Sequence, residues 1–212
     1  MTLPPEVLNS KNNNEKIEVL KELISSYLYK EILEFEDVRN SRVLFDLIKA
    51  LAFQIGSEVS FTELSSKLGI DKKTVERYID LLEKAYVVFR VGPYTNNKRR
   101  AIKKHSKYYF YDLGIRNAVI NNFNDINFRN DLGELFENLC MVERKKYNEY
   151  HRLNTNQYFL RTYDGAEIDL IEENNGKLNA YEFKLTKKIT KDKSKDWNSF
   201  KVINKENLWN FS

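Results

Sequence analysis

Two acids and a lysine near the C-terminal end have the types and spacing of a metal-dependent hydrolytic site. The stretch "EIDLIEENNGKLNAYEFKLT", residues 167–186, contains Asp169, Glu182 and Lys184. Carboxylate oxygens suit Mg²⁺ and Mn²⁺, and such an ion can activate water and offset charge on a scissile phosphate. A lysine beside them could position the water or stabilise the phosphate. These three residues are therefore candidates for a site of phosphodiester hydrolysis.

The pairing of two strands decides whether these side chains meet. If Asn174 to Lys177 form the loop of a hairpin, Asp169 lies opposite Glu182. A slip by one residue would mix the two faces, whereas this register gathers four apolar residues on the other face: Ile168, Leu170, Tyr181 and Phe183. Facing acids repel each other without a counter-charge, which a divalent ion would supply. The alternative is an ordinary hairpin with a solvated polar face.

The middle of the chain predicts a winged helix-turn-helix over residues 41–124. The short helix within residues 60–70 is followed by a turn at Gly69, and Asp71 is a good N-cap for the next helix. The apolar face of this second helix consists of Val75, Ile79, Leu82 and Tyr86. Two strands are expected next, within residues 86–94 and 107–114, and they would form the wing.

DNA is the partner expected for this part of the chain. A recognition helix presents polar side chains to base edges and phosphates, which here are Lys72, Lys73, Thr74, Glu76, Arg77 and Tyr78. The wing "KRRAIKKHSK" has six bases and no acid, and its candidates for phosphate contact are Lys98, Arg99, Arg100, Lys103, Lys104 and Lys107. Three alternatives stay open: a protein-docking module, a purely structural role, and, for the wing alone, a basic loop that is merely solvated.

The composition predicts a folded protein of the cytoplasm. The chain has 212 residues, 42% of them hydrophobic and 13% aromatic, which is enough material for real cores. The net charge of +4 does not by itself indicate nucleic acid. Cys140 is the single cysteine; it lies in an apolar run, so we expect a core residue in a reducing compartment. No signal peptide or membrane-spanning run is apparent.

The C-terminal third predicts a helix followed by strands, and its motifs resemble a known family. Residues 132–150 read as the helix, and turns are expected at Asp164-Gly165 and at 174–176. The segments "GELFEN", "RTYDGAEIDLIEE" and "AYEFK" resemble the C-terminal domain of unknown function in a large family of prokaryotic AAA-type ATPases. Three earlier segments resemble the same family in the same order: "SSYLYKEILEF", "FTELSSKLGIDKKTVERYIDLLEKAYVVFRV" and "YFYDLGIRNAVI".

The resemblance implies a fold and a fourth site residue. The C-terminal part of that family is similar to the PD-(D/E)xK nuclease superfamily, so the expected fold is α+β with a nuclease-like domain and a central mixed sheet. Glu137 matches the helix glutamate, Asp169 the hairpin aspartate, and Glu182 and Lys184 the final acid-x-lysine. Asp169 and Glu182 would hold Mg²⁺ or Mn²⁺, while Glu137 and Lys184 would assist catalysis.

The chain departs from that family in one respect. It contains no G-x-x-x-x-G-K-[ST] phosphate loop, so we expect no ATP site and no ATPase activity by this chain alone. The chain then resembles a fragment or gene remnant without the ATPase core. We expect three parts: a linker and helical remnant of the ATPase lid (1–40), the winged helix (41–124) and the nuclease-like domain (125–212). The alternative is a non-catalytic DNA- or protein-binding module that keeps the fold.

Overall fold

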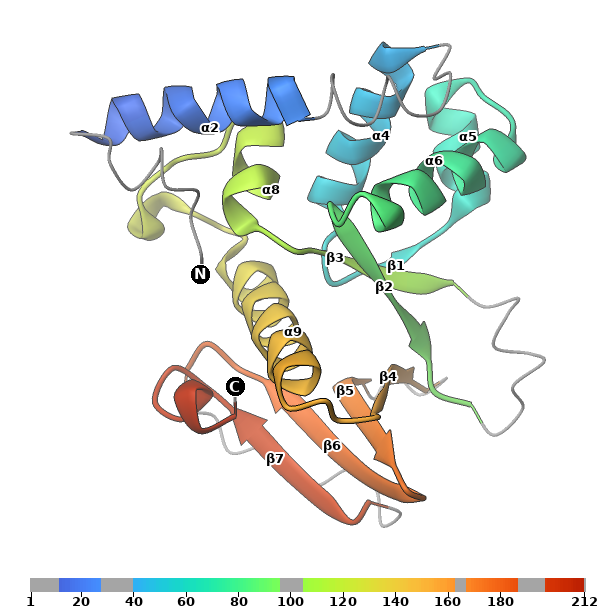
Figure 1. Cartoon of the computed structure of the whole chain (residues 1–212), viewed down its shortest axis with the longest axis vertical. Helices are drawn as coiled ribbons and strands as arrows, with labels where there is room; N and C mark the ends of the chain where they lie inside the picture. The colour runs from blue at the N-terminus through green and yellow to red at the C-terminus, as the bar shows by residue number, and fades with distance from the viewer. Residues whose placement is uncertain (1–11, 28–39, 96–104, 163–166, 187–196, 212) are drawn as a thin grey trace. The chain divides into compact units, whose positions relative to one another are not determined.

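The computed structural model describes residues 12–27, 40–95, 105–162, 167–186 and 197–211 (Figure 1). These residues form six α-helices and a seven-stranded mixed sheet. The architecture is therefore α+β, as the sequence predicts. The chain divides into two compact units that alternate in sequence: residues 1–89 with 110–129, and residues 90–109 with 130–212. No helix in the described part is both long enough and apolar enough to cross a membrane.

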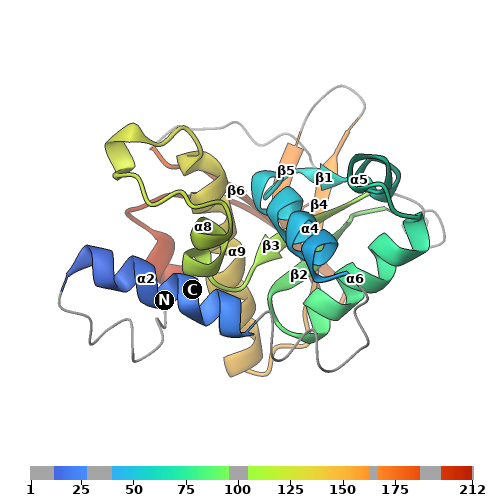
Figure 2. The same cartoon turned by 90° about the horizontal axis from the view of Figure 1, so that it is seen from above.

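Helices dominate the first unit. They are α2 (Asn13–Tyr27), α4 (Ser41–Phe53), α5 (Phe61–Leu68), α6 (Lys72–Lys84) and α8 (Leu113–Val119), followed by the 3₁₀ turn η2 (Ile126–Phe128). Helix α2 packs against α8, and α4 contacts both α5 and α8 (Figure 2). Helix α2 begins at Asn13, after Asn12, whose side chain accepts a hydrogen bond from the Glu15 amide and caps the helix.

Helices α5 and α6 form the predicted pair with a tight turn between them. Gly69 ends α5 with φ +65°, a left-handed conformation that glycine adopts at little cost. Asp71 caps α6, because its carboxylate accepts the Thr74 amide at 2.9 Å. The prediction is wrong for one residue of the expected apolar face of α6. Tyr86 lies beyond the end of α6 with φ +54° and is 71% exposed, because the helix stops at Lys84.

Seven strands are hydrogen-bonded in the order β1-β3-β2-β4-β5-β6-β7. Their bounds are β1 (Glu58–Val59), β2 (Val88–Pro93), β3 (Ser106–Phe110), β4 (Asn156–Arg161), β5 (Glu167–Asn174), β6 (Lys177–Phe183) and β7 (Ser199–Ile203). Strands β4, β5 and β6 are antiparallel neighbours, whereas β2 runs parallel to β4 and β7 parallel to β6. All five residues of β3 are buried, as expected for its aromatic run.

The β5–β6 hairpin has the predicted register from its turn up to the pair Leu170 and Tyr181. Asn175 and Gly176 both have positive φ, as a two-residue type I′ turn requires. The register between β4 and β5 shifts, because Tyr158 pairs with Ile171 but Leu160 pairs with Ile168. Strand β5 therefore has one extra residue between these pairs, which indicates a bulge beside Asp169. The bulge interrupts the expected alternation. Ile168, which was predicted to share a face with Leu170, instead joins an apolar cluster with Ile171 and Ala180.

Helix α9 (Leu132–Tyr150) covers strand β6 in the second unit and has the limits that the sequence predicts. Its buried residues include Phe136, Met141 and Cys140, which confirms the cysteine as a core residue. The 3₁₀ turn η3 (Leu208–Asn210) follows β7. The sequence pattern did not predict β7.

Candidate functional site

A buried lysine from β3 lies among acidic side chains of the second unit. Lys107 Nζ is 3.2 Å from Glu137 Oε1 on α9 and 2.7 Å from Glu167 Oε1 at the start of β5. Lys107 is 1% exposed, and its ammonium lies 5.3 Å from the ring centre of Phe159. Burial opposes the charged form, but the charges of Glu137 and Glu167 outweigh it and raise the pKa of Lys107. The amine therefore remains protonated.

Tyr109, two residues further along β3, fixes the same glutamate. Its hydroxyl donates to Glu137 Oε1 at 2.6 Å. Burial and the nearby charge of Glu137 raise the pKa of Tyr109 well above its usual value, so the phenol stays a neutral donor. Residues at 107 and 109 share a face because side chains alternate along a strand. Strand β3 therefore supplies both partners that hold Glu137 in place.

Asp169 lies beside the bulge of β5 and is almost fully buried. Its Oδ2 accepts a hydrogen bond from the Phe183 amide at 2.7 Å. Burial raises the pKa of Asp169 to about 7, and the charge of Glu137 adds to the rise. The Phe183 amide, Lys107 and Lys184 act in the opposite direction but do not cancel it. The carboxyl of Asp169 therefore lies in an environment with too little positive charge.

Glu182 and Lys184 form the other side of the site, at the end of β6. Lys184 Nζ lies 2.9 Å from Glu182 Oε1. The other oxygen, Glu182 Oε2, is buried and has no hydrogen-bond partner among the described residues. Burial lowers the pKa of Lys184, but Glu182 and then the charges of Asp169 and Glu137 raise it above its ordinary value. Lys184 is thus paired with Glu182 and lies within the influence of the Asp169 and Glu137 charges. Its side chain is still 38% exposed.

These side chains form what we call the carboxylate cluster, which has more acids than bases. Its members are the acids Glu137, Glu167, Asp169 and Glu182 and the bases Lys107 and Lys184. When all four acids are ionised, the cluster carries two more negative than positive charges. Buried carboxylates with too few counter-charges are costly. Either a proton on Asp169 or an added cation relieves this excess.

The donor set suits a cation that needs few protein ligands. Within the described part of the chain, no three His, Cys, Asp or Glu side chains are placed to share one metal ion. Mg²⁺, however, binds proteins through one or two carboxylates and keeps several waters or substrate phosphates. Asp169 and Glu182 fit this requirement, because one carboxyl has a raised pKa and the other has a buried oxygen without a partner.

The predicted DNA-contacting residues of α6 are largely accessible. Lys72, Lys73 and Arg77 are exposed. Thr74 is half-buried, and its hydroxyl is hydrogen-bonded to the N-cap Asp71 at 2.6 Å. Tyr78 was expected to face the DNA, but it is 3% exposed and belongs to the core. That part of the prediction is wrong.

Most of the predicted wing lies outside the described residues. This applies to Lys98, Arg99, Arg100, Lys103 and Lys104. Lys107 is described, and its assignment to the wing is wrong: its ammonium is bound by Glu137 and Glu167 inside the second unit. The sequence did contain a sign that Lys107 is a buried counter-charge to acids. Lys107 directly precedes a run of aromatic strand residues, where a lysine is buried only if acids accompany it.

Sequence reasoning also missed Tyr109 and Glu167 as members of the site. Tyr109 stood in the strand expected within residues 107–114, with no role in the site. Glu167 lies in the hairpin stretch but was given no role there, whereas the structure pairs it with Lys107. Both residues act through contacts with β3 and α9 that no local pattern encodes.

Comparison with known families accounts for both parts of the chain. The chain belongs to the family described as Domain of unknown function (DUF8612), whose model matches residues 4–126. Residues 132–209 match a second model, Domain of unknown function (DUF4143). The second domain is associated with the C-terminal part of AAA-type ATPases, which confirms that coarser part of the resemblance.

The relatives that the chain matches are prokaryotic. An uncharacterized protein of Haemophilus influenzae is 26% identical over 130 residues, which cover 59% of this chain and 31% of that protein. One of Methanocaldococcus jannaschii is 24% identical over 147 residues (67% and 31%), and one of Mycobacterium tuberculosis is 27% identical over 138 residues (64% and 30%). The chain thus spans about a third of the length of these curated relatives. No solved structure matches it significantly.

Proposed function

We propose that this chain is a DNA-associated effector portion of an AAA-type ATPase and hydrolyses phosphodiester bonds with Mg²⁺ or Mn²⁺. One observation carries the proposal: the carboxylate cluster has an excess of negative charge, expressed in the raised pKa of Asp169. A divalent cation would remove this excess. The α9–β5–β6 arrangement that holds the cluster also agrees with a nuclease-like fold of the PD-(D/E)xK kind, with a glutamate on the helix and acids on two adjacent strands.

Each residue of the cluster has a role in this proposal. Asp169 and Glu182 hold the ion, which when bound lowers the pKa of a water and offsets charge on the phosphate. Lys184 is the one ammonium of the cluster with substantial exposure, so it can reach a phosphate oxygen or the attacking water. Glu137 is fixed by Lys107 and Tyr109, and its charge acts on Asp169. Glu137 therefore helps to set the charge of the metal-binding pair.

DNA association is assigned to α6 and the segment that follows it. Helices α5 and α6 with strands β2 and β3 agree with a winged helix, whose second helix would enter the major groove. Lys72, Lys73 and Arg77 are exposed along α6, and the basic run 98–104 lies between the two strands in sequence. Bases in these positions suit phosphate contacts. The acids Glu76 and Asp80 on the same helix moderate the attraction.

A cleavage assay tests the proposed activity. Wild type and Asp169→Ala are incubated without ATP with supercoiled plasmid and with single strands, in Mg²⁺ and in Mn²⁺. We expect nicking by wild type that chelation abolishes and that Asp169→Ala loses by at least a hundredfold. Equal cleavage by both proteins would reveal a contaminating nuclease. An absence of cleavage by wild type would reject the hydrolytic proposal.

The second candidate is a binding module that keeps the fold without catalysis. It is favoured by Lys107, because an internal cation already compensates Glu137 and Glu167. It also agrees with the lack of a three-ligand metal group among the described residues. DNA binding by a wild type that cleaves nothing, with affinity that falls steeply as salt rises, would select this candidate.

A further inference from the structure

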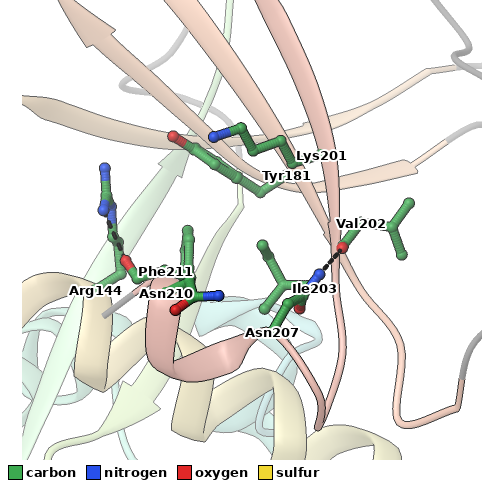
Figure 3. A pocket seen from close by; sticks show the side chains of 8 residues that line it. All are labelled: Arg144, Tyr181, Lys201, Val202, Ile203, Asn207, Asn210 and Phe211. Carbon is green, nitrogen blue, oxygen red and sulfur yellow. Dashed lines mark hydrogen bonds between the residues drawn. The ribbon is translucent and has the colours of Figure 1, made fainter.

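A pocket of about 390 Å³ lies between α9, strands β6 and β7 and the C-terminal turn η3. Its lining consists of Arg144, Tyr181, Lys201, Val202, Ile203, Asn207, Asn210 and Phe211 (Figure 3). The volume lies within the range of small-molecule sites, roughly 300–1,000 Å³. Tyr181 and Lys201 are register partners on adjacent parallel strands, and so are Phe183 and Ile203. Strands β6 and β7 therefore form one wall of the pocket.

Arg144 is held rigidly at one end of the pocket. Its guanidinium binds Glu172 through Nε and Nη2, the shortest distance being 2.7 Å, and Nη1 donates to the Phe211 carbonyl at 2.8 Å. Glu172 also accepts from Asn148 at 2.7 Å. A guanidinium has five N–H groups, so one N–H on each terminal nitrogen is left without a partner among the described residues. The guanidinium also packs over the rings of Tyr147, Tyr181 and Phe211, so it is already ordered before a ligand binds.

The charge of the lining favours an anion. Two cations and no carboxylate line the pocket. Glu172 forms an ion pair with Arg144 but does not itself line the pocket. Lys201 makes no ion pair with any described residue. Figure 3 shows Lys201 extended beside the Tyr181 ring, with Asn210 and Phe211 across from them. An anionic group bound here would gain charge-assisted hydrogen bonds, which are about twice as strong as neutral ones.

The remaining lining selects a ligand with a flat apolar body. The rings of Tyr181 and Phe211 are 4.9 Å apart between centroids and inclined at 59°, so they pack against each other and present aromatic edges to the pocket. Ile203 adds aliphatic surface, and Val202 contributes its carbonyl, which accepts from Asn207 at 2.9 Å. The Asn210 amide offers both a donor and an acceptor. A nucleobase has a planar face and a polar edge that match these groups, and its phosphate matches the two cations.

We propose that this pocket binds a nucleoside monophosphate, either free or as the phosphorylated end of a strand. Lys201 and Arg144 hold the phosphate, the base lies against the Tyr181 and Phe211 side chains, and Asn210 reads its edge. The pocket lies on the face of β6 opposite to Glu182, because consecutive strand side chains point in opposite directions. The proposal therefore does not depend on hydrolysis at the carboxylate cluster.

Isothermal titration calorimetry of the whole chain tests the site. AMP, TMP, a 5′-phosphorylated dinucleotide and inorganic phosphate are titrated separately into wild type, Lys201→Ala and Lys205→Ala. Lys205 is an exposed lysine that does not line the pocket, so its variant controls for general charge. We expect AMP or TMP to bind wild type and Lys205→Ala alike, and to bind Lys201→Ala about tenfold more weakly, as loss of one charge-assisted contact implies.

Three results would overturn the assignment. They are no heat from either mononucleotide or the dinucleotide at millimolar concentration, equal affinity of wild type and Lys201→Ala, and inorganic phosphate binding as tightly as AMP. If the dinucleotide binds more tightly than AMP, the site belongs to strand ends, and if AMP binds more tightly, it belongs to free nucleotides. Both of these results support the pocket. Circular dichroism of Lys201→Ala verifies that the exposed substitution leaves the fold intact.

Discussion

Lys107 Nζ lies 2.7 Å from Glu167 Oε1, so strand β3 contributes a buried cation to an acid at the start of β5. The same ammonium reaches Glu137 on α9. A lysine that is 1% exposed persists in a core only where acids surround it. The carboxylate cluster is therefore assembled from residues far apart in the sequence, and its own lysine compensates part of its negative charge.

Replacing this lysine should be strongly destabilising. Lys107→Met keeps most of the volume but leaves Glu137 and Glu167 without their cation. Breaking a buried ion pair from one side costs about 3–5 kcal/mol. We expect the free energy of unfolding, measured by urea denaturation, to fall by about this amount.

A matched surface variant controls for the loss of one positive charge. Lys205→Met removes an exposed lysine from the same unit, and such changes usually stay within about 0.5 kcal/mol. If Lys107→Met and Lys205→Met unfold at the same urea concentration, Lys107 does not stabilise the cluster.

Asp169 should make stability depend on pH in a defined direction. Its pKa is raised from 3.8 to about 7 in the folded chain, so the folded state holds this proton more tightly than the unfolded state. The contribution of Asp169 to stability is therefore full below the unfolded pKa and is lost as pH rises towards the folded pKa. Asp169→Asn removes this loss and keeps an oxygen for the Phe183 amide.

Thermal unfolding in metal-free buffer measures the effect. We expect the Tm of Asp169→Asn to rise relative to wild type by several degrees between about pH 4 and about pH 8, because a few kcal/mol are involved. A Tm difference that stays constant across this range would show that Asp169 ionises normally.

Much of this fold could be predicted because the deciding signals are local. The Asp71 cap, the Gly69 turn and the Asn175-Gly176 turn each specify backbone geometry within a few residues. The hairpin register also follows from its turn and its apolar pattern. Asp169, Glu182 and Lys184 were candidates from their spacing in the hairpin, and Glu137 was added as a candidate only by the family resemblance.

The unpredicted part depends on packing between distant segments. The bulge beside Asp169 arises from the pairing of β5 with β4. The prediction considered only the β5–β6 hairpin, and it therefore placed Ile168 on the same face as Leu170, which is wrong. Lys107 looked like a member of the basic wing because its neighbours in sequence are basic. Its real environment is set by Glu137 and Glu167, thirty and sixty residues further along the chain.

Two glycines in helices should respond differently to alanine. A Cβ at Gly114 would lie 2.8 Å from Asp112 Oδ1 and 3.3 Å from Leu20 Cδ2, and the Asp112 carboxylate caps α8. A Cβ at Gly133 of α9 meets nothing within 4 Å. Alanine favours a helix over glycine by about 0.5–1 kcal/mol, whereas loss of a cap costs about 1 kcal/mol.

We therefore expect Gly133→Ala to be neutral or stabilising and Gly114→Ala to be less stable than it by about 1–2 kcal/mol. Chemical denaturation of both variants measures the difference. Equal stability would mean that the α8 cap and Leu20 tolerate the added methyl group.

Exposed bases of α6 should affect the salt dependence of DNA binding. If Arg77 contacts a phosphate, Arg77→Ala should weaken binding to all sequences and reduce the slope of log affinity against log salt by about one. Lys84→Ala on the last turn of the same helix is the control, since Lys84 is paired with Asp80 at 2.8 Å. Fluorescence anisotropy with duplex DNA at several salt concentrations gives both slopes. An unchanged slope for Arg77→Ala would exclude the phosphate contact.

The most direct measurement concerns the divalent cation that we propose for the carboxylate cluster. Mn²⁺ is titrated by calorimetry into metal-free wild type and Asp169→Asn at about pH 8, where the Asp169 carboxyl of wild type is ionised. We predict one saturable Mn²⁺ per wild-type chain and binding at least tenfold weaker in Asp169→Asn. An absence of saturable binding to wild type, or the same affinity in both proteins, would contradict a metal site at Asp169 and Glu182.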